Sequence, residues 1–387
     1  MDKKNVLIRG PLLSLSGYGV HTRQIYRWLE SRQDIKITSQ VLPWGTTTWM
    51  IDHDLEGGMI GRIIKSATNI TPQYDVTIQI QLPNEWDPSL GRFNVGVTAA
   101  VETDICNVDW LLAMDKMSLI VVPSEHVKQT IQRTGNVMTP IVVIPESFMD
   151  EVSFTNLETL SLDLDTSFNF LILGQLTGAD ERTDRKNTFN TLKWLCEEFE
   201  GNKEVGIVIK TNSGTGSIQD RYHTEETIKI AVNKFRKGEY PRVHFIHGSM
   251  TSSEVASLYR HPSIKALVAL TRGEGYGLPI LEAAASGLPV ISTNWSGHLD
   301  FLKCGKHIPV NYILMPIPDN RADGKIFVKN SRWAEPNESD AKQKLQKFYT
   351  RPTIPREWAS DLREIILKKY SFEAISALYD KEIGEIM

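Results

Sequence analysis

The chain has 387 residues, 41% hydrophobic and 23% charged, and at roughly 100–200 residues per domain this length predicts two globular domains. Its formal net charge is −4, so the chain as a whole is not basic enough to indicate a surface that neutralises the phosphates of DNA or of an anionic membrane. Composition does not report on a local basic patch. Three cysteines without a CxxC pair indicate buried free thiols, and no apolar run reaches membrane-spanning length, so we expect a soluble cytoplasmic protein.

The first 145 residues predict strands that alternate with helices. A short apolar strand at 6–9 leads into a Gly/Ser loop, after which apolar residues from Val20 to Leu29 follow helical spacing. Further strands are predicted at 75–81, 94–100, 119–124 and 140–145. Such alternation favours an α/β fold with a doubly wound parallel sheet.

A second α/β region follows a polar segment, residues 146–167, which has no clear period and which we interpret as an interdomain linker. The pattern weakens over 305–350, which predicts a long insertion or irregular surface, and helical character returns at 371–387. The predicted strands are 168–175, 205–211, 242–248, 265–270 and 288–293, and the predicted helices are 187–199, 224–237, 252–260 and 279–286.

The stretch "TRGEGYGLPILEAAASGLPVIST" (271–293) places two glutamates around a glycine-rich turn. Pro279 fits the first turn of a helix, and the backbone N–H groups from Gly275 to Leu278 would suit a phosphate at that helix's N-terminus. We expect Glu282 in the first turn, where the helix dipole favours its ionised form and where it would hold the vicinal diol of a ribose. Glu274 would meet the group on the distal phosphate. Spacing alone equally allows a glycine-rich connection with two solvated glutamates.

The segment "EGYGLPILEAAASGLPVI" (274–291) resembles the signature of the GT-B-fold retaining glycosyltransferases of family 4, also called glycosyltransferase group 1. Weaker similarity continues through "GYGVHTRQIYRWL", "VTAAVETD" and "VVIPESF". The resemblance implies two facing Rossmann-like domains with an interdomain cleft. Residues 1–160 would bind the acceptor, residues 161–365 would bind a nucleotide sugar, and residues 366–387 would form a helix crossing back to the first domain.

The resemblance also implies a donor site with catalytic groups beside it. Lys186 fits the family's lysine, which neutralises the diphosphate, but Gln175 stands at the arginine position, so Arg185 or Arg182 would supply the second charge. Glu102 fits the position near the transferred sugar where many members have a histidine. The donor-binding residues implied by the match are Gly17, Gly19, Lys186, Ser249, Met250, Glu274, Gly275, Tyr276, Gly277, Leu278 and Glu282.

Other residues have a plain structural interpretation beside a functional one. His21 and Arg23 begin the first helix and need have no role, and Trp86 with Phe93 would form either an aromatic platform or part of the core. Two DxD strings, at 52–54 and 163–165, do not follow strands as a metal site would require, so we interpret them as surface. We predict no metal and no cofactor beyond the donor, because the lysine and the helix N-terminus would neutralise the phosphate.

We therefore predict a retaining glycosyltransferase that uses a nucleoside-diphosphate sugar. A glycan or another hydroxyl compound is the favoured acceptor; residues 1–160 hold 13 Lys+Arg against 18 Asp+Glu, so a modified DNA base is a less favoured alternative. A GT-B sugar-nucleotide epimerase and a catalytically degenerate sugar-nucleotide-binding protein stay open. The G-x-G-x-x-G and P-loop patterns of dinucleotide oxidoreductases and nucleotide hydrolases are absent from the sequence.

Overall fold

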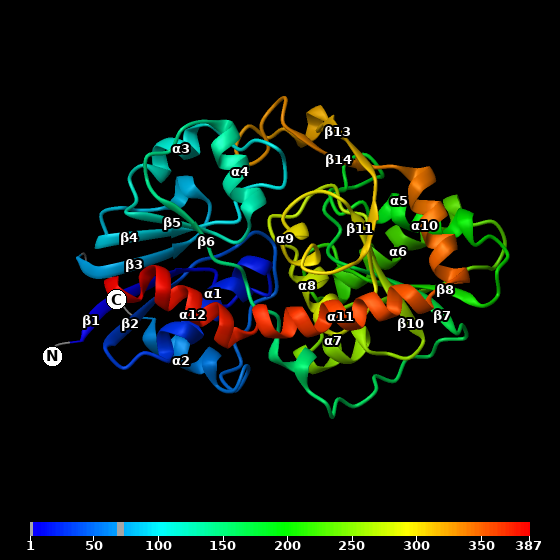
Figure 1. Cartoon of the computed structure of the whole chain (residues 1–387), viewed down its shortest axis with the longest axis horizontal. Helices are drawn as coiled ribbons and strands as arrows, with labels where there is room; N and C mark the ends of the chain where they lie inside the picture. The colour runs from blue at the N-terminus through cyan, green and yellow to red at the C-terminus, as the bar shows by residue number, and fades with distance from the viewer. Residues whose placement is uncertain (1–2, 68–72) are drawn as a thin grey trace. The chain divides into compact units, whose positions relative to one another are not determined.

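The computed structural model describes residues 3–67 and 73–387, which form two compact units, each built around one parallel sheet (Figure 1). Unit 1 contains the described residues up to Ser147, together with Gly324–Val328 and Phe372–Met387. Unit 2 contains Phe148–Asp323 and Lys329–Ser371. The predicted α/β class with two Rossmann-like sheets is confirmed.

The sheet of unit 1 has the strand order β2-β1-β3-β4-β5-β6, and all of its neighbours pair in parallel. Sequence analysis missed β2, because this edge strand alternates apolar and polar residues weakly. The strands are β1 (Lys4–Gly10), β2 (Ile35–Val41), β3 (Tyr74–Ile80), β4 (Gly91–Val97), β5 (Leu119–Val122) and β6 (Ile141–Val143).

The C-terminal helix of the chain packs against the first helix within unit 1 (Figure 1). The rings of Trp28 and Tyr379 stack with their centroids 5.0 Å apart, and Trp28 Nε1 donates a hydrogen bond to Asp380 Oδ1 at 3.0 Å. The helices of unit 1 are α1 (Gly17–Glu30), α2 (Met59–Ser66), α3 (Asp109–Met114), α4 (Glu125–Thr134) and α12 (Phe372–Ile383), with short 3-10 turns at Pro83–Glu85 and Gly384–Ile386.

The sheet of unit 2 has the order β12-β11-β10-β7-β8-β9, again parallel throughout. The chain therefore winds outward in one direction from β7 and in the other from β10, and these two neighbouring strands mark the point where the order reverses. The strands are β7 (Phe168–Leu173), β8 (Val205–Lys210), β9 (Arg242–Ile246), β10 (Ile264–Ala269), β11 (Val290–Thr293) and β12 (Ile308–Val310).

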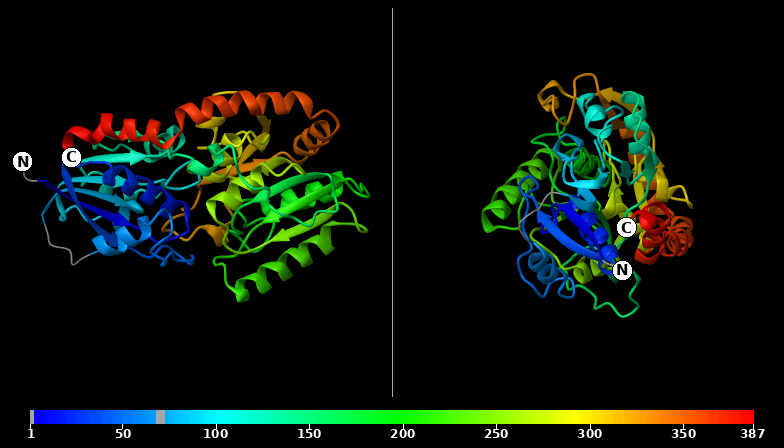
Figure 2. Two further views of the ribbon diagram at one scale, coloured as in Figure 1. Left: turned by 90° about the horizontal axis from the view of Figure 1, so that it is seen from below. Right: turned by 90° about the vertical axis from the view of Figure 1, so that its left-hand side faces the viewer.

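Helices cover this sheet and complete an apolar core. The long helix α6 lies along one face of the sheet (Figure 2, left), where Ile228 and Val232 join Ile207 and Phe170 in the buried cluster. The helices of unit 2 are α5 (Thr188–Glu198), α6 (Ile218–Phe235), α7 (Ser252–Tyr259), α8 (Leu278–Ala285), α9 (Leu299–Leu302), α10 (Glu338–Thr350) and α11 (Thr353–Lys369), with 3-10 turns at Asp150–Ser153 and Asp319–Arg321.

Over 305–350, where the sequence predicted a long insertion or irregular surface, the chain forms regular elements, so the second alternative is wrong. Besides β12 and α10, this segment forms an antiparallel hairpin of β13 (Tyr312–Pro316) and β14 (Arg332–Pro336). The hairpin carries prolines at strand ends and a long connection, which hide the strand pattern, and α10 buries only a narrow stripe of Ala341, Leu345 and Phe348. Helix α11 was also not predicted, and α6 begins at Ile218, earlier than the predicted 224.

Several expectations about the surface and the thiols can be compared with the structure. Both DxD strings have exposed aspartates, as interpreted from the sequence. All three cysteines are free; Cys106 and Cys196 are buried and Cys304 is half-buried. Among the described residues, no helix has the length and apolar character needed to cross a membrane.

Candidate functional site

Two loops leave the sheet of unit 2 at its strand-order reversal. One follows β7 and runs from Gly174 to Asn187; the other follows β10 and runs from Leu270 to Gly277. Because β7 and β10 are parallel neighbours, both loops start at the same edge of the sheet. In open α/β sheets, ligands bind outside the carboxyl ends of the strands at such a reversal.

The loop after β7 is closed by a buried aspartate. The Asp184 carboxylate accepts hydrogen bonds from Thr177 N at 3.1 Å, from Thr177 Oγ1 at 2.6 Å and from Thr188 N at 2.7 Å at the start of α5. Asn187 has a left-handed φ of 57° and donates from Nδ2 to the carbonyl of Leu270 at 3.0 Å. The loop is therefore tied to itself, to α5 and to the end of β10, and Lys186 has a fixed starting point.

Lys186 and Glu274, predicted to belong to one site, form a direct ion pair. Lys186 Nζ lies 2.7 Å from Glu274 Oε1 and 2.8 Å from Oε2, and Arg185 Nη1 lies 3.6 Å from Glu274 Oε2. Arg185 Nη1 also donates to the carbonyl of Gly273 at 2.6 Å. Burial acts to raise the pKa of Glu274, but Lys186 and Arg185 outweigh it and lower that pKa to about 2. Glu274 is ionised throughout the physiological range.

Residues that sequence analysis missed hold Glu274 in place. Its backbone N–H donates to Ser296 Oγ at 2.9 Å, and its carbonyl accepts from Gly297 N at 2.9 Å. His298 is fully buried, with Nδ1 3.3 Å from Ser296 Oγ and Nε2 2.8 Å from the carbonyl of Thr293. Burial lowers the pKa of His298, so the imidazole is held neutral. The run "NWSGH" (294–298) directly after β11, the neighbour of β10, was the available signal.

The glycine-rich turn continues into α8 as predicted. Gly277 has φ of 101°, and a Cβ there would lie 3.1 Å from His298 Cβ, so this position requires glycine. Pro279 lies in the first turn of α8. The ring of Tyr276 is buried edge-on against Phe301, with centroids 5.4 Å apart. What Tyr276 offers a ligand is therefore its backbone.

The prediction that Glu282 is ionised in the first turn of α8 is wrong on both counts. Glu282 is the fifth residue of the helix, in its second turn, and only 8% of its surface is exposed. Burial raises its pKa to about 8, and the nearby Glu151 acts in the same direction, although Tyr259 Oη donates to Glu282 Oε2 at 3.3 Å. The carboxyl group is therefore mostly protonated at neutral pH without a ligand.

The remaining residues predicted in unit 2 lie in the surface loops of the same sheet. Gln175 and Arg182 are exposed, and of the two candidate arginines it is Arg185 that lies beside Glu274. Ser249 is exposed and Met250 half-buried in the loop after β9. This loop is fastened to the end of β8, because Lys210 Nζ donates to the carbonyl of Gly248 at 2.7 Å.

In unit 1 the two predicted glycines differ. A Cβ on Gly19 would lie 2.0 Å from the carbonyl oxygen of Ser14, whereas a Cβ on Gly17 would meet no atom within 4 Å. Tyr18, between them, has its Oη 3.0 Å from Thr98 Oγ1 and accepts from Ala99 N at 2.9 Å at the end of β4. Glu102 is half-buried two residues after Ala100, which has a left-handed φ of 47°.

Three residues for which the sequence left a functional or a structural role open are buried inside unit 1. His21 is not on the helix surface: it is buried, its Nε2 lies 3.1 Å from Tyr379 Oη, and burial lowers its pKa to about 4. Arg23 is buried and donates to the carbonyls of Leu12 and Ser14 at 3.0 and 2.8 Å. Trp86 packs against Gly96 in the core rather than forming a platform.

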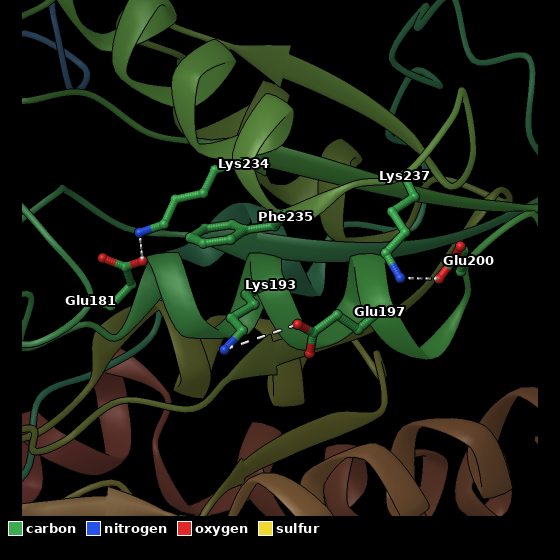
Figure 3. A pocket seen from close by; sticks show the side chains of 7 residues that line it. All are labelled: Glu181, Lys193, Glu197, Glu200, Lys234, Phe235 and Lys237. Carbon is green, nitrogen blue, oxygen red and sulfur yellow. Dashed lines mark hydrogen bonds and ion pairs between the residues drawn. The ribbon is translucent and has the colours of Figure 1, made fainter.

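A cavity of about 420 Å³ lies elsewhere in unit 2 and is no candidate for this site (Figure 3). Its charged side chains pair with one another: Lys234 with Glu181, Lys193 Nζ with Glu197 Oε1 at 3.9 Å, and Lys237 with Glu200. None of the residues that line it belongs to the predicted donor site.

Comparisons with known proteins agree with the motif. Residues 233–319 match the model of the family described as glycosyl transferases group 1. A sucrose synthase of Melioribacter roseus is 27% identical over 173 residues, 40% of this chain, and the match spans only 21% of that protein.

Two solved structures share the whole fold. The sucrose-phosphate synthase of Thermosynechococcus elongatus superposes with a TM-score of 0.64 at 14% identity, covering 99% of both chains. Anabaena HepE, solved in complex with UDP and glucose, superposes with a TM-score of 0.61 at 12% identity, covering 98% of this chain and 99% of that one. At such identities the likeness shows the fold alone. The chain thus has the GT-B fold, and its residues 233–319 are similar to the group 1 glycosyl transferases.

Proposed function

We propose that this protein transfers a sugar from a nucleoside-diphosphate sugar to an acceptor hydroxyl with retention of the anomeric configuration. The observation that carries the proposal is the cluster of Lys186, Arg185 and Glu274 at the strand-order reversal of unit 2. Two cations and a fixed carboxylate beside a helix N-terminus are what a diphosphate with a sugar attached requires.

Each group then has a role in the chemical step. The acceptor oxygen bonds to the anomeric carbon on the face from which the diphosphate leaves, the bond from that carbon to the diphosphate oxygen breaks, and the acceptor proton passes to the departing phosphate oxygen. Lys186, Arg185 and the amides from Gly275 to Leu278 stabilise the negative charge that develops on the phosphate. With these charges in place we expect transfer in the presence of EDTA.

Glu274 is proposed to hold the sugar hydroxyls, Glu282 the ribose diol, and Glu102 of unit 1 the reacting end. Because the hydroxyls of a diol donate to a carboxylate, they favour its charged form, so ribose binding would drive the proton from Glu282. The ion pair in the ligand-free protein keeps Lys186 in position, and on donor binding the lysine turns from Glu274 to the phosphate.

The HepE relative was solved with UDP and glucose, which makes UDP-glucose the first donor to test. The acceptor is proposed to be a glycan or another hydroxyl compound. Residues 1–160 carry more acidic than basic side chains, which counts against DNA as the acceptor.

The test compares Glu274→Gln with wild type in two assays: donor turnover by release of the nucleoside diphosphate, and affinity for the bare nucleotide by calorimetry. We expect turnover to fall on the order of 100-fold, as for loss of one preorganised polar group in an active site. Bare nucleotide should bind at least as tightly, because Lys186 no longer has a competing carboxylate.

Glu197→Gln is the matched control, since Glu197 on α5 likewise pairs with two lysines, Lys342 at 2.6 Å and Lys193 at 3.9 Å, outside the proposed site. It should leave both quantities unchanged. Equal, small effects of Glu274→Gln on turnover and affinity would contradict the proposal.

A further inference from the structure

Arg272 is a buried cation that neither the motif nor the resemblance assigns. It lies two residues before Glu274, and only 3% of its surface is exposed. Removing a guanidinium from water is costly unless most of its donors are hydrogen-bonded. The contacts of Arg272 therefore indicate what it is fixed to.

On one side Arg272 holds the loop that carries the two site cations. Its Nη1 donates to the carbonyl of Asp184 at 2.7 Å and its Nη2 to the carbonyl of Glu181 at 2.8 Å. Its backbone N–H donates to the carbonyl of Arg185 at 2.8 Å. Three carbonyls of the segment 181–185, which leads directly into Lys186, are therefore bonded to one residue.

On the other side Arg272 is held by strand β14 of the hairpin. Nε and Nη2 form a two-pronged ion pair with the Glu335 carboxylate at 2.7 and 3.0 Å. The guanidinium carbon lies 5.3 Å from the centre of the Trp333 ring, and the carbonyl of Arg272 accepts from Ala334 N at 2.9 Å. The planar guanidinium can make these contacts and the carbonyl contacts together; a lysine ammonium cannot.

We propose that Arg272, oriented by Glu335, is a positioning residue that sets where Arg185 and Lys186 stand relative to Glu274. The inference rests on the proposed function, because it gives those cations their task. The hydrogen-bond donors of Arg272 are bonded to backbone carbonyls and to Glu335. Arg272 therefore acts on a bound diphosphate indirectly, through the loop after β7. The hairpin, which sequence analysis interpreted as insertion or irregular surface, thereby becomes part of the support of the site.

The experiment uses the full chain and four probes: UDP, GDP, ADP and CDP, each titrated by calorimetry. Arg272→Lys should weaken the affinity for the nucleotide that wild type binds about tenfold or more. Misplacing the groups of a site by 1 Å can cost about 100-fold in rate. Hydrogen exchange of the amides in 177–187 should become faster. Glu335→Gln, which keeps the shape but removes the charge, should do the same to a smaller extent and guards against a variant that does not fold.

Arg260→Lys is the control, because Arg260 also donates to two carbonyls in unit 2, those of Val152 and Phe154. It should cost thermal stability without changing nucleotide affinity or exchange in 177–187. If wild type binds a nucleotide and neither Arg272→Lys nor Glu335→Gln changes its affinity, this inference alone is overturned. Unchanged hydrogen exchange of the amides in 177–187 would overturn it as well. A wild type that binds none of the four nucleotides would overturn the proposed function and this inference with it.

Discussion

Glu282 shows how much the protonation of one residue depends on its surroundings. Its position in the motif was readable from the sequence, but its state depends on burial beside Tyr259 of α7, 23 residues away, and on Glu151. Burial without a neighbouring cation disfavours the charged carboxylate of Glu282. Glu274 is also buried, but Lys186 and Arg185 beside it stabilise its charged form. Two glutamates with seven residues between them thus hold opposite protonation states at neutral pH.

This difference makes a prediction about stability and pH. The pKa of Glu282 is about 8 in the folded protein and 4.5 in the reference state, so between these values the folded state keeps a proton that the unfolded state releases. The contribution of Glu282 to the free energy of unfolding is fully present below about pH 4.5 and is lost as the pH rises through 8.

Glu282→Gln has no such proton, so it should not share the loss of stability that wild type undergoes as the pH rises from 5 to 8.5. Its free energy of unfolding should therefore increase relative to that of wild type over this range. The gain should be on the order of a few kcal/mol at most, with each pKa unit worth about 1.4 kcal/mol. Urea unfolding at several pH values measures it. A difference between the two proteins that does not change with pH would show that Glu282 is ionised in the fold.

The residues that sequence analysis found are those close together in a motif or matched by family position, such as Glu274 and Lys186. It missed Arg272 because its partner Glu335 lies 63 residues away on a strand that was not predicted. It missed His298 because the run after β11 points to the site only once β11 is known to lie beside β10.

At the scale of elements, strands with continuous apolar runs were predicted to within a few residues, because a strand buried on both faces is apolar throughout. The edge strands β6 and β9 were predicted as well, but the edge strands β2 and β12 and the hairpin strands were not. The edge strand β2 has only three apolar residues, Ile35, Ile37 and Val41, among four polar ones, and the hairpin strands β13 and β14 are partly exposed.

The glycine loop at the start of α1 offers a matched pair of substitutions. Gly19→Ala would place a Cβ 2.0 Å from Ser14 O, so we expect a loss of about 1–3 kcal/mol or more in the free energy of unfolding. Gly17→Ala meets open space and should leave stability unchanged or slightly higher.

If a substrate approaches Gly17 as the resemblance implies, Gly17→Ala should lower kcat/KM at normal stability. Chemical unfolding and donor turnover of both variants provide the check. Full activity in Gly17→Ala would remove Gly17 from the site, and a stable Gly19→Ala would contradict the packing of this loop.

At the scale of the whole molecule, alternation of strands and helices was enough to predict two α/β units, because each unit needs its own sheet and core. The resemblance implied a helix at 366–387 that crosses back to the first domain, and in the structure Phe372–Met387 belong to unit 1. The spacing of polar and apolar residues in α12 does not identify the helix against which it packs. That helix is α1, through Trp28 and His21.

The central claim is that unit 2 binds a nucleoside diphosphate at Lys186. The measurement that tests it most directly is the thermal midpoint of wild type, Lys186→Ala and the surface control Lys193→Ala in UDP, GDP, ADP and CDP. A ligand at 100 times its Kd adds about 2.7 kcal/mol of stability, which corresponds to a rise of several degrees. We predict such a rise for one base in wild type and in Lys193→Ala, and its loss in Lys186→Ala. No rise with any nucleotide, or an equal rise in Lys186→Ala, would contradict the claim.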